Sequence, residues 1–271
     1  MDTLRQRLHD PAVLLRLNAF LMSYFGWIAF GIIYGYLGRW SIDFTGSFLE
    51  LPLTSRDLVL GLVELTKSVP FLDPLFSAVY YLGFSGSIAL TVAYLLLYKR
   101  DLEGSDELFL RYLGAYAVAG VVYLVAHVHA PHMVYGMPGY TSVNTLLTRQ
   151  EFVLPSLHNT FVAIHIITLW KYRKSPSGRA LIGMNTMIPF ATVLLGHHWI
   201  YDVVTGFLLG IAVSRFTEGR HTDIPEVLYG IEVRSLRRIT VFNLLLAILV
   251  LIVAVDPERW HELVTGILQN P

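Results

Sequence analysis

Two short stretches place ionisable side chains at the edges of long apolar segments. LPSLHNTF covers residues 154–161, and GHHWIYDVV covers residues 196–204. In the second stretch His198 and Asp202 are four residues apart, so their side chains share one face if the segment is helical. A carboxylate beside an imidazole fixes the tautomer of the ring and raises its basicity, as a histidine nucleophile or base requires. A simple capping interaction near a helix start is the alternative interpretation of this pair.

The first stretch has the composition of a helix start. Pro155 suits a helix entry, Ser156 can cap the helix, and His158 follows in the first turn. The free N–H groups of a first helical turn form a natural anion site. An anion-binding helix start near a carboxylate-oriented histidine predicts phosphoryl transfer.

The composition predicts that these residues lie in a membrane protein. Hydrophobic residues make up 54% of the 271-residue chain and charged residues only 15%, against about 25% charged residues in an average soluble protein. Lys plus Arg and Asp plus Glu balance at 20 each, which gives no indication of nucleic-acid binding. The absence of cysteine excludes disulfides, thiolate metal sites and cysteine nucleophiles.

The apolar segments predict an all-α, polytopic helical bundle in one integral-membrane domain, residues 1–271, with its catalytic core at about residues 75–216. Seven segments approach the roughly 20 residues that a span needs: 15–37, 75–98, 109–130, 156–172, 180–195, 200–216 and 239–255. Residues 55–69 are interrupted by charges and predict an interfacial amphipathic helix, with Ser55 as N-cap and Pro70 as its stop.

The Lys and Arg residues predict an orientation for this bundle. With a cytoplasmic N-terminus and seven alternating spans, fifteen of the twenty basic residues fall inside and five outside, a strong positive-inside bias. The segment 131–155 and the turn 196–201 then both face the extracytoplasmic side, where the two histidine stretches can converge.

Six of the ten histidines map to the outer ends of the third to sixth predicted spans. An ionisable residue within a membrane is a functional candidate by default, although histidines at helix ends also lie harmlessly at the headgroup level. His165, two turns deeper than His158, is interpreted as a hydrogen-bonded structural histidine. The six are His127, His129, His132, His158, His197 and His198.

The two stretches resemble the type-2 phosphatidic acid phosphatase superfamily, whose motifs include P-S-G-H and S-R-x5-H-x3-D. This chain has P-S-L-H at residues 155–158 and His198-x3-Asp202, about forty residues apart. They look most like the inositol phosphorylceramide synthase-like branch, and VHAPHM at 128–133 looks like a degenerate form of its A-P-P segment. The resemblance covers roughly residues 109–216 and implies a six-helix core, here with one extra C-terminal span.

The resemblance implies roles for individual residues. His198 would attack phosphorus and form a phosphohistidine, Asp202 would orient it, and His158 would protonate the leaving oxygen. Phosphate oxygens would be held by Ser156, with further candidates in His197, His129, His132 and Arg149, and weaker ones in Tyr140 and Asn159. Neither a metal nor a cofactor is implied, and the expected partner is a membrane lipid.

Two departures from the family pattern favour a transferase. The K-x6-R-P motif is absent, and Thr192 stands where the S-R-x5-H-x3-D motif has arginine. Fewer cationic donors favour a singly charged phosphodiester over a phosphomonoester. Arg149 could replace one of the missing phosphate-binding arginines or be a solvated loop residue.

Two alternative functions remain open. The second hypothesis is a phosphatase that uses water and acts on a lipid phosphate or an isoprenoid diphosphate. The third is a non-enzymatic transporter or a haem- or metal-binding membrane protein.

Overall fold

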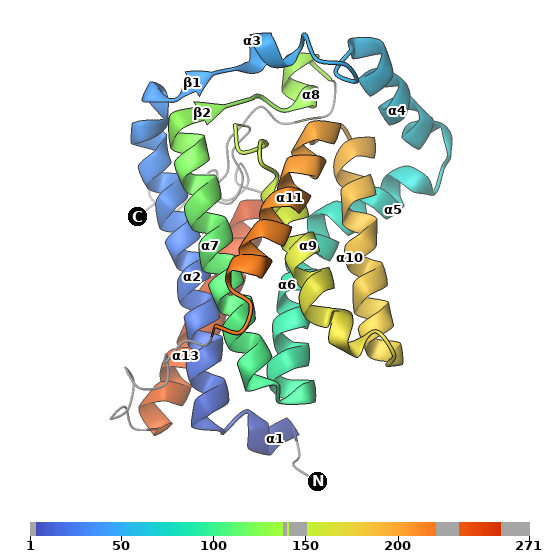
Figure 1. The fold of residues 1–271 in the computed structure, drawn as a ribbon. Coiled ribbons are helices and arrows are strands. Elements are labelled where there is room, and N and C mark those ends of the chain that lie inside the picture. Colours follow the sequence, from blue (N-terminus) through green and yellow to red (C-terminus); the bar gives the residue numbers. More distant parts are fainter. Residues whose placement is uncertain (1–3, 138–139, 141–150, 221–232, 256–271) are drawn as a thin grey trace, which may run out of the picture.

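Helices dominate the structure, a computed structural model that describes residues 4–137, 140, 151–220 and 233–255 (Figure 1). Two short strands, β1 (Ile42–Asp43) and β2 (Ala126–His127), pair in parallel. The helical elements are α1 (Leu4–Arg7), α2 (Pro11–Leu37), η1 (Gly38–Trp40), α3 (Thr45–Phe48), α4 (Arg56–Ser68), α5 (Leu72–Ala78), η2 (Val79–Gly83), α6 (Phe84–Ala93), η3 (Tyr94–Lys99), α7 (Leu102–Val125), α8 (Pro131–Val134), α9 (Leu157–Leu169), η4 (Trp170–Tyr172), α10 (Pro176–Leu194), α11 (Ile200–Phe216) and α13 (Val233–Val255).

Four helical segments within the described residues are long and apolar enough to cross a membrane. They are Pro11–Trp40, Leu72–Lys99, Leu102–Val125 and Arg234–Ile252. Together with the mostly helical structure, they agree with the predicted all-α membrane fold.

The predicted count of seven spans, and the orientation derived from it, are not supported by helix length and composition. The three remaining predicted spans coincide with α9, α10 and α11, which have 13, 19 and 17 residues and fail these criteria. α9 has only 13 residues, too few to cross a membrane by itself. It lies inside the bundle, where even Asn159 and His165 are covered by protein, and an apolar composition on all sides is typical of such a buried helix.

The third predicted span was wrong at its C-terminal end. α7 starts at Leu102 and stops at Val125, and the chain then becomes extended, with His127 opposite Asp43 in the strand pair. The N–H of Phe44 donates to the carbonyl of His127 at 2.9 Å. Farther along, Ala130 is extended, as is typical of a residue that precedes proline.

The predicted amphipathic helix is confirmed as α4, which ends at Ser68, two residues before Pro70. Ser55 occupies the N-cap position, but its side chain makes no capping hydrogen bond.

Helices α9 and α11 pack closely through two glycines. A Cβ on Gly206 would lie 2.5 Å from the carbonyl oxygen of Ser156, and one on Gly210 would lie 2.6 Å from that of Thr160. The start of α9 can therefore approach α11 at backbone distance, and this approach positions the candidate site.

Polar contacts between helices fix the rest of the bundle. Arg16 of α2 and Asp106 of α7 form a buried ion pair at 2.7 Å. Asn18 of α2 donates to Thr240 of α13 at 2.6 Å and accepts from Asn243 at 2.9 Å. These contacts hold α7 and α13 against α2, whose outward side chains are largely apolar.

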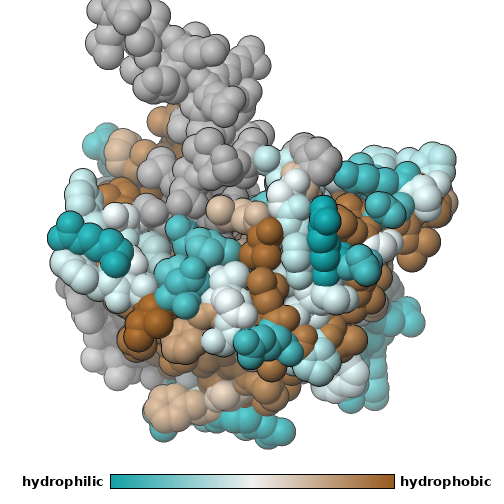
Figure 2. All heavy atoms as spheres, turned by 90° about the horizontal axis from the view of Figure 1, so that it is seen from above, coloured by the Kyte–Doolittle hydropathy of each residue, from teal (hydrophilic) through white to brown (hydrophobic). Residues whose placement is uncertain are grey.

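The short elements β1, β2, α3, α4 and α8 lie across one end of the bundle (Figure 1). Seen from above, this end shows hydrophilic side chains interspersed with hydrophobic ones (Figure 2). It is also the end at which α9 and α11 begin and α10 ends, so His158, His197 and His198 lie at this end as well.

Candidate active site

A tight turn between α10 and α11 presents the two adjacent histidines. Gly196 adopts a positive φ of 71°, a conformation that glycine reaches without strain. The N–H groups of His197 and His198 both donate to the carbonyl of Thr192 at 3.0 Å. These hydrogen bonds fix the backbone of the turn independently of any contact that the two imidazoles make.

His198 lies between a carboxylate and a hydroxyl. Its Nδ1 is 3.3 Å from Oδ2 of Asp202, and its Nε2 is 3.4 Å from Oγ of Ser156. The N–H of Trp199 donates to the same Asp202 oxygen at 2.8 Å. Because an ionised carboxylate only accepts, this arrangement favours the tautomer with the proton on Nδ1 and the lone pair on Nε2.

Burial keeps His198 uncharged. Its side chain is 3% exposed, and burial lowers the pKa of the imidazole to about 4. A neutral ring at physiological pH retains the Nε2 lone pair that a nucleophile needs.

Ser156 joins the starts of the two helices. It occupies the N-cap of α9, as predicted, and its Oγ accepts from Nδ2 of Asn159 at 3.0 Å and from the Asn159 N–H at 3.4 Å. Its own N–H donates to the backbone carbonyl of Asp202 at 3.3 Å. A backbone hydrogen bond thus joins Ser156, the predicted phosphate-binding residue, to Asp202, whose carboxylate faces His198.

The ring of His158 faces the ring of His198 with 5.4 Å between the centroids. Phe84 and Tyr80 flank His158 at centroid distances of 4.1 and 5.1 Å. Apart from these ring contacts, the described residues provide His158 with no recorded hydrogen bond, so its ring nitrogens remain available for proton transfer.

A second group of rings surrounds His197. Tyr80 stacks on it at 4.1 Å with an interplanar angle of 6°, and His132 and Tyr140 approach it edge-on at 5.2 and 5.3 Å. Nδ1 of His132 lies 3.1 Å from the carbonyl of Gly196. His197 therefore lies between His132 and Tyr80, and Tyr80 in turn contacts His158.

His129 is placed differently from the prediction. Its ring turns toward Asp43, with Nε2 3.7 Å from Oδ2, and packs against His127. Only its backbone approaches the site, since the indole N–H of Trp199 donates to the His129 carbonyl at 2.9 Å. Arg149, the remaining candidate, lies outside the described residues.

Tyr80 is a site residue that sequence reasoning missed. It contacts both His158 and His197 from η2, in the second predicted span. A tyrosine within an apolar run carries no sequence signal that separates it from the other fourteen tyrosines of the chain.

His165 has the structural role expected of it. Nδ1 lies 2.7 Å from Oδ1 of Asn185, and Nε2 is hydrogen-bonded to the hydroxyl of Tyr112. Both ring nitrogens therefore have protein partners.

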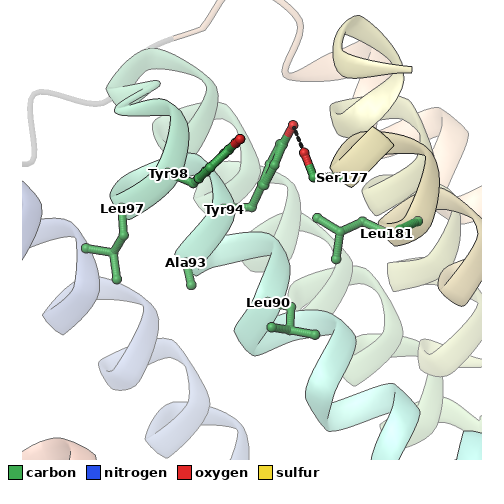
Figure 3. Close-up of a pocket in the computed structure, with 8 residues that line it drawn as sticks. Leu90, Ala93, Tyr94, Leu97, Tyr98, Ser177 and Leu181 are labelled. Atoms are coloured by element: carbon green, nitrogen blue, oxygen red, sulfur yellow. Dashed lines mark hydrogen bonds between the residues drawn. The ribbon is translucent and has the colours of Figure 1, made fainter. Parts of the chain in front are cut away.

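An apolar groove at the far end of α10 is separate from the site. Leu90, Tyr94, Ser177 and Leu181 line it, and the hydroxyls of Tyr94 and Ser177 point toward each other at 3.4 Å (Figure 3). From Leu181 in the groove lining, α10 rises roughly 20 Å to its end at Leu194, which separates the groove from the histidine turn.

Comparisons with known proteins agree with the geometry. The chain is 27% identical to an uncharacterized protein of Methanocaldococcus jannaschii over 221 residues, which is 81% of this chain and 90% of that protein. No solved structure matches the chain. The family model of the PAP2 superfamily matches residues 108–218, which include His158, His198 and Asp202. This match supports an integral membrane protein with phosphatase- or phosphotransferase-type activity on lipid phosphates, and it does not separate the inositol phosphorylceramide synthase-like branch from the others.

Proposed function

We propose that the protein is a lipid phosphotransferase that moves a phospho-headgroup from a phospholipid to an alcohol acceptor through a phosphohistidine. The observation that carries the proposal is the position of His198. Asp202 lies at its Nδ1, the capping hydroxyl of Ser156 lies at its Nε2, and the ring of His158 faces it. A nucleophile, its orienting group and a proton donor are thereby in one place.

In the first step, the Nε2 lone pair of His198 attacks phosphorus and forms the P–N bond. The bond from phosphorus to the leaving oxygen breaks, and His158, protonated once the anionic phosphate is bound, gives its proton to that oxygen. Asp202 stabilises the positive charge that develops on the His198 ring. Ser156 and the N–H groups at the start of α9 hold the phosphoryl oxygens.

In the second step, the hydroxyl of the acceptor attacks phosphorus, and the P–N bond breaks. His158, neutral after the first step, takes the hydroxyl proton and returns to its starting state. The two steps conserve protons and release His198 as the neutral imidazole.

Thr192 supports the choice of a diester donor. It replaces the family arginine, and its hydroxyl donates to the carbonyl of Pro189 at 2.8 Å. This position therefore supplies no positive charge to a phosphate. A phosphodiester carries one negative charge and needs less cationic compensation than a monoester.

The decisive experiment follows a labelled phospholipid with purified protein in detergent, with and without an added long-chain alcohol. Transfer to the alcohol, with little release into water, supports a transferase. If the labelled phosphate is instead released into water, and the added alcohol does not change this, the result indicates a phosphatase. A phosphorylated protein that is acid-labile and base-stable, and that His198→Ala does not form, supports the intermediate; its formation by that variant would contradict the mechanism.

We also propose that the site faces the extracytoplasmic side, on the strength of the positive-inside bias. Because the chain has no cysteine, single cysteines can report the orientation directly. Ser47→Cys lies in α3 near the site, and Lys174→Cys lies beyond the other end of α9; both positions are exposed. An impermeant reagent added to intact cells should label only Ser47→Cys, and labelling of both variants would overturn the orientation.

A further inference from the structure

We propose that Asp43, His127 and His129 form a zinc-binding site that is separate from the phosphoryl-transfer residues. The three side chains come from the strand pair and the segment after β2. One ligand atom from each lies within 4.8 Å of the other two. The site goes beyond the proposed function, which uses none of these side chains for the chemistry.

The tautomer of His127 is set by its neighbours. The hydroxyl of Ser41 donates to the carbonyl of Tyr123 at 2.8 Å. Its oxygen must therefore accept from Nδ1 of His127, which lies 3.1 Å away. The Nε2 lone pair of His127 then faces Oδ1 of Asp43 at 4.0 Å.

Two acceptors thus point at each other, an arrangement that a cation between them would stabilise. Thr45 holds the carboxylate of Asp43 in place, since its N–H donates to Oδ1 at 2.8 Å and its hydroxyl donates to the same oxygen. The hydrogen bond that Nδ1 of His127 donates to Ser41 is also a common feature of metal-bound histidine, because it fixes the ring and leaves the other nitrogen for the metal.

The ring of His129 makes no recorded hydrogen bond with a described residue. Its Nδ1 is buried and without a partner, and its Nε2 faces Oδ2 of Asp43 at 3.7 Å, beyond hydrogen-bond distance. A histidine aimed at a carboxylate without bonding to it is the second, independent indication of a missing cation.

The donor set identifies the class of metal. Two imidazoles and one carboxylate suit zinc and similar first-row divalent ions, whereas calcium and magnesium prefer oxygen ligands only. Tetrahedral zinc places its ligand atoms roughly 3.4 Å apart, so the observed 3.7 and 4.0 Å pairs need only small shifts. Asp43 and His129 have side-chain exposures of 50% and 30%, which gives them room for these shifts and the ion a path from solvent.

Zinc would also stabilise the short elements that lie across the end of the bundle near the candidate active site. It would join β1 to the segment whose His129 carbonyl accepts from the Trp199 indole, and Trp199 follows His198 directly. The ion would therefore fasten the short elements over the candidate site without touching the reacting atoms.

Zinc titration of the full-length, detergent-purified protein tests the proposal. The protein should carry a tag without histidine and be stripped with a chelator before calorimetry and metal analysis. We expect one zinc per chain, visible d–d absorption bands with cobalt in its place, and a rise in the thermal midpoint on zinc addition. Asp43→Ala, His127→Ala and His129→Ala should each weaken zinc binding by about tenfold or more.

Three further variants separate this site from the histidines of the candidate active site and from misfolding. Ser41→Ala keeps all three ligands and removes only the hydroxyl that orients His127, so it should weaken binding by about tenfold. His9→Ala and His198→Ala should bind zinc as the unaltered protein does. Absence of stoichiometric binding, or binding lost in His198→Ala and unaffected in His127→Ala, would overturn the proposal.

Discussion

Two buried histidines of this bundle have opposite surroundings. His165 and His198 are 0% and 4% exposed. His165 has hydrogen-bond partners on both ring nitrogens, Tyr112 and Asn185. His198 has a carboxylate at Nδ1, while its Nε2 is approached at 3.4 Å by a hydroxyl that already caps a helix.

The difference teaches how to tell a structural histidine from a reactive one when burial is equal. A ring with two strong protein partners has no lone pair to offer, and its removal costs stability. A ring held on one side by a carboxylate is oriented and polarised, and its other nitrogen stays available to a substrate.

The strongest test of this comparison removes the reactive ring. His198→Ala should lower turnover on the order of 10⁴-fold or more, because no other group forms the covalent intermediate. Turnover per monodisperse, folded molecule is the quantity to measure, with His165→Ala as the matched control. Retention of full turnover in His198→Ala would remove the distinction between the two histidines.

The next test keeps the ring and alters its orientation. Asp202→Asn should lower turnover about 10²- to 10⁴-fold, because an amide can present its N–H to Nδ1 and favour the wrong tautomer. The Trp199 N–H and Nδ1 of His198 share one oxygen of Asp202, so an amide that turns its N–H toward Nδ1 also gives up the hydrogen bond from Trp199, and the helix start should lose some stability. Thermal unfolding recorded alongside the kinetics checks that point, and an unchanged turnover would show that Asp202 only caps α11.

Substitution of the structural histidine, His165, should lower the stability of the protein rather than its turnover. His165→Ala leaves Tyr112 and Asn185 without their ring partner, which should cost about 1–3 kcal/mol of unfolding free energy for each unpaired group. Ile164→Ala, on the same helix, controls for lost packing alone. Turnover of the folded His165→Ala fraction should stay within a few-fold of the unaltered protein, and a loss comparable to that of His198→Ala would refute the assignment.

The smallest effect concerns the helix contact that brings the reactive residues together. Gly206→Ala should destabilise the protein by about 1–3 kcal/mol, because the new Cβ would lie 2.5 Å from the Ser156 carbonyl. Gly183→Ala on α10, where a Cβ meets nothing within 4 Å, is the matched control. Thermal unfolding of both variants measures the difference, and equal midpoints would show that α9 and α11 can separate without loss.

Local sequence patterns were enough to predict the centre of the candidate site. The helix-start signature around Ser156 depends only on capping, and Ser156 is the N-cap of α9. His198 and Asp202 also meet, but not on one helix face: His198 precedes Trp199, the N-cap of α11, and Asp202 accepts from the Trp199 N–H as a capping residue does. His129 was placed wrongly because its ring direction depends on a strand that forms only when residues 42–43 and 126–127 meet. No local pattern encodes that pairing.

The number of spans was harder to predict for a related reason. Apolar content was taken as a sign of lipid contact, but α9 is apolar because it lies among other helices. Tyr80 was missed because its contacts with His158 and His197 arise from the packing of η2 against α10, which is a long-range property of the bundle.

The hydrogen bond from the Ser156 N–H to the Asp202 carbonyl distinguishes two sides of the candidate site. The side made by α9 and α11 carries His158 and His198 and is joined backbone to backbone. The side that carries Tyr80 is a π-helical segment between α5 and α6, and such segments occur frequently at functional sites. Under the proposed function, substitutions in η2 should therefore change which substrate is accepted while the reaction chemistry stays the same.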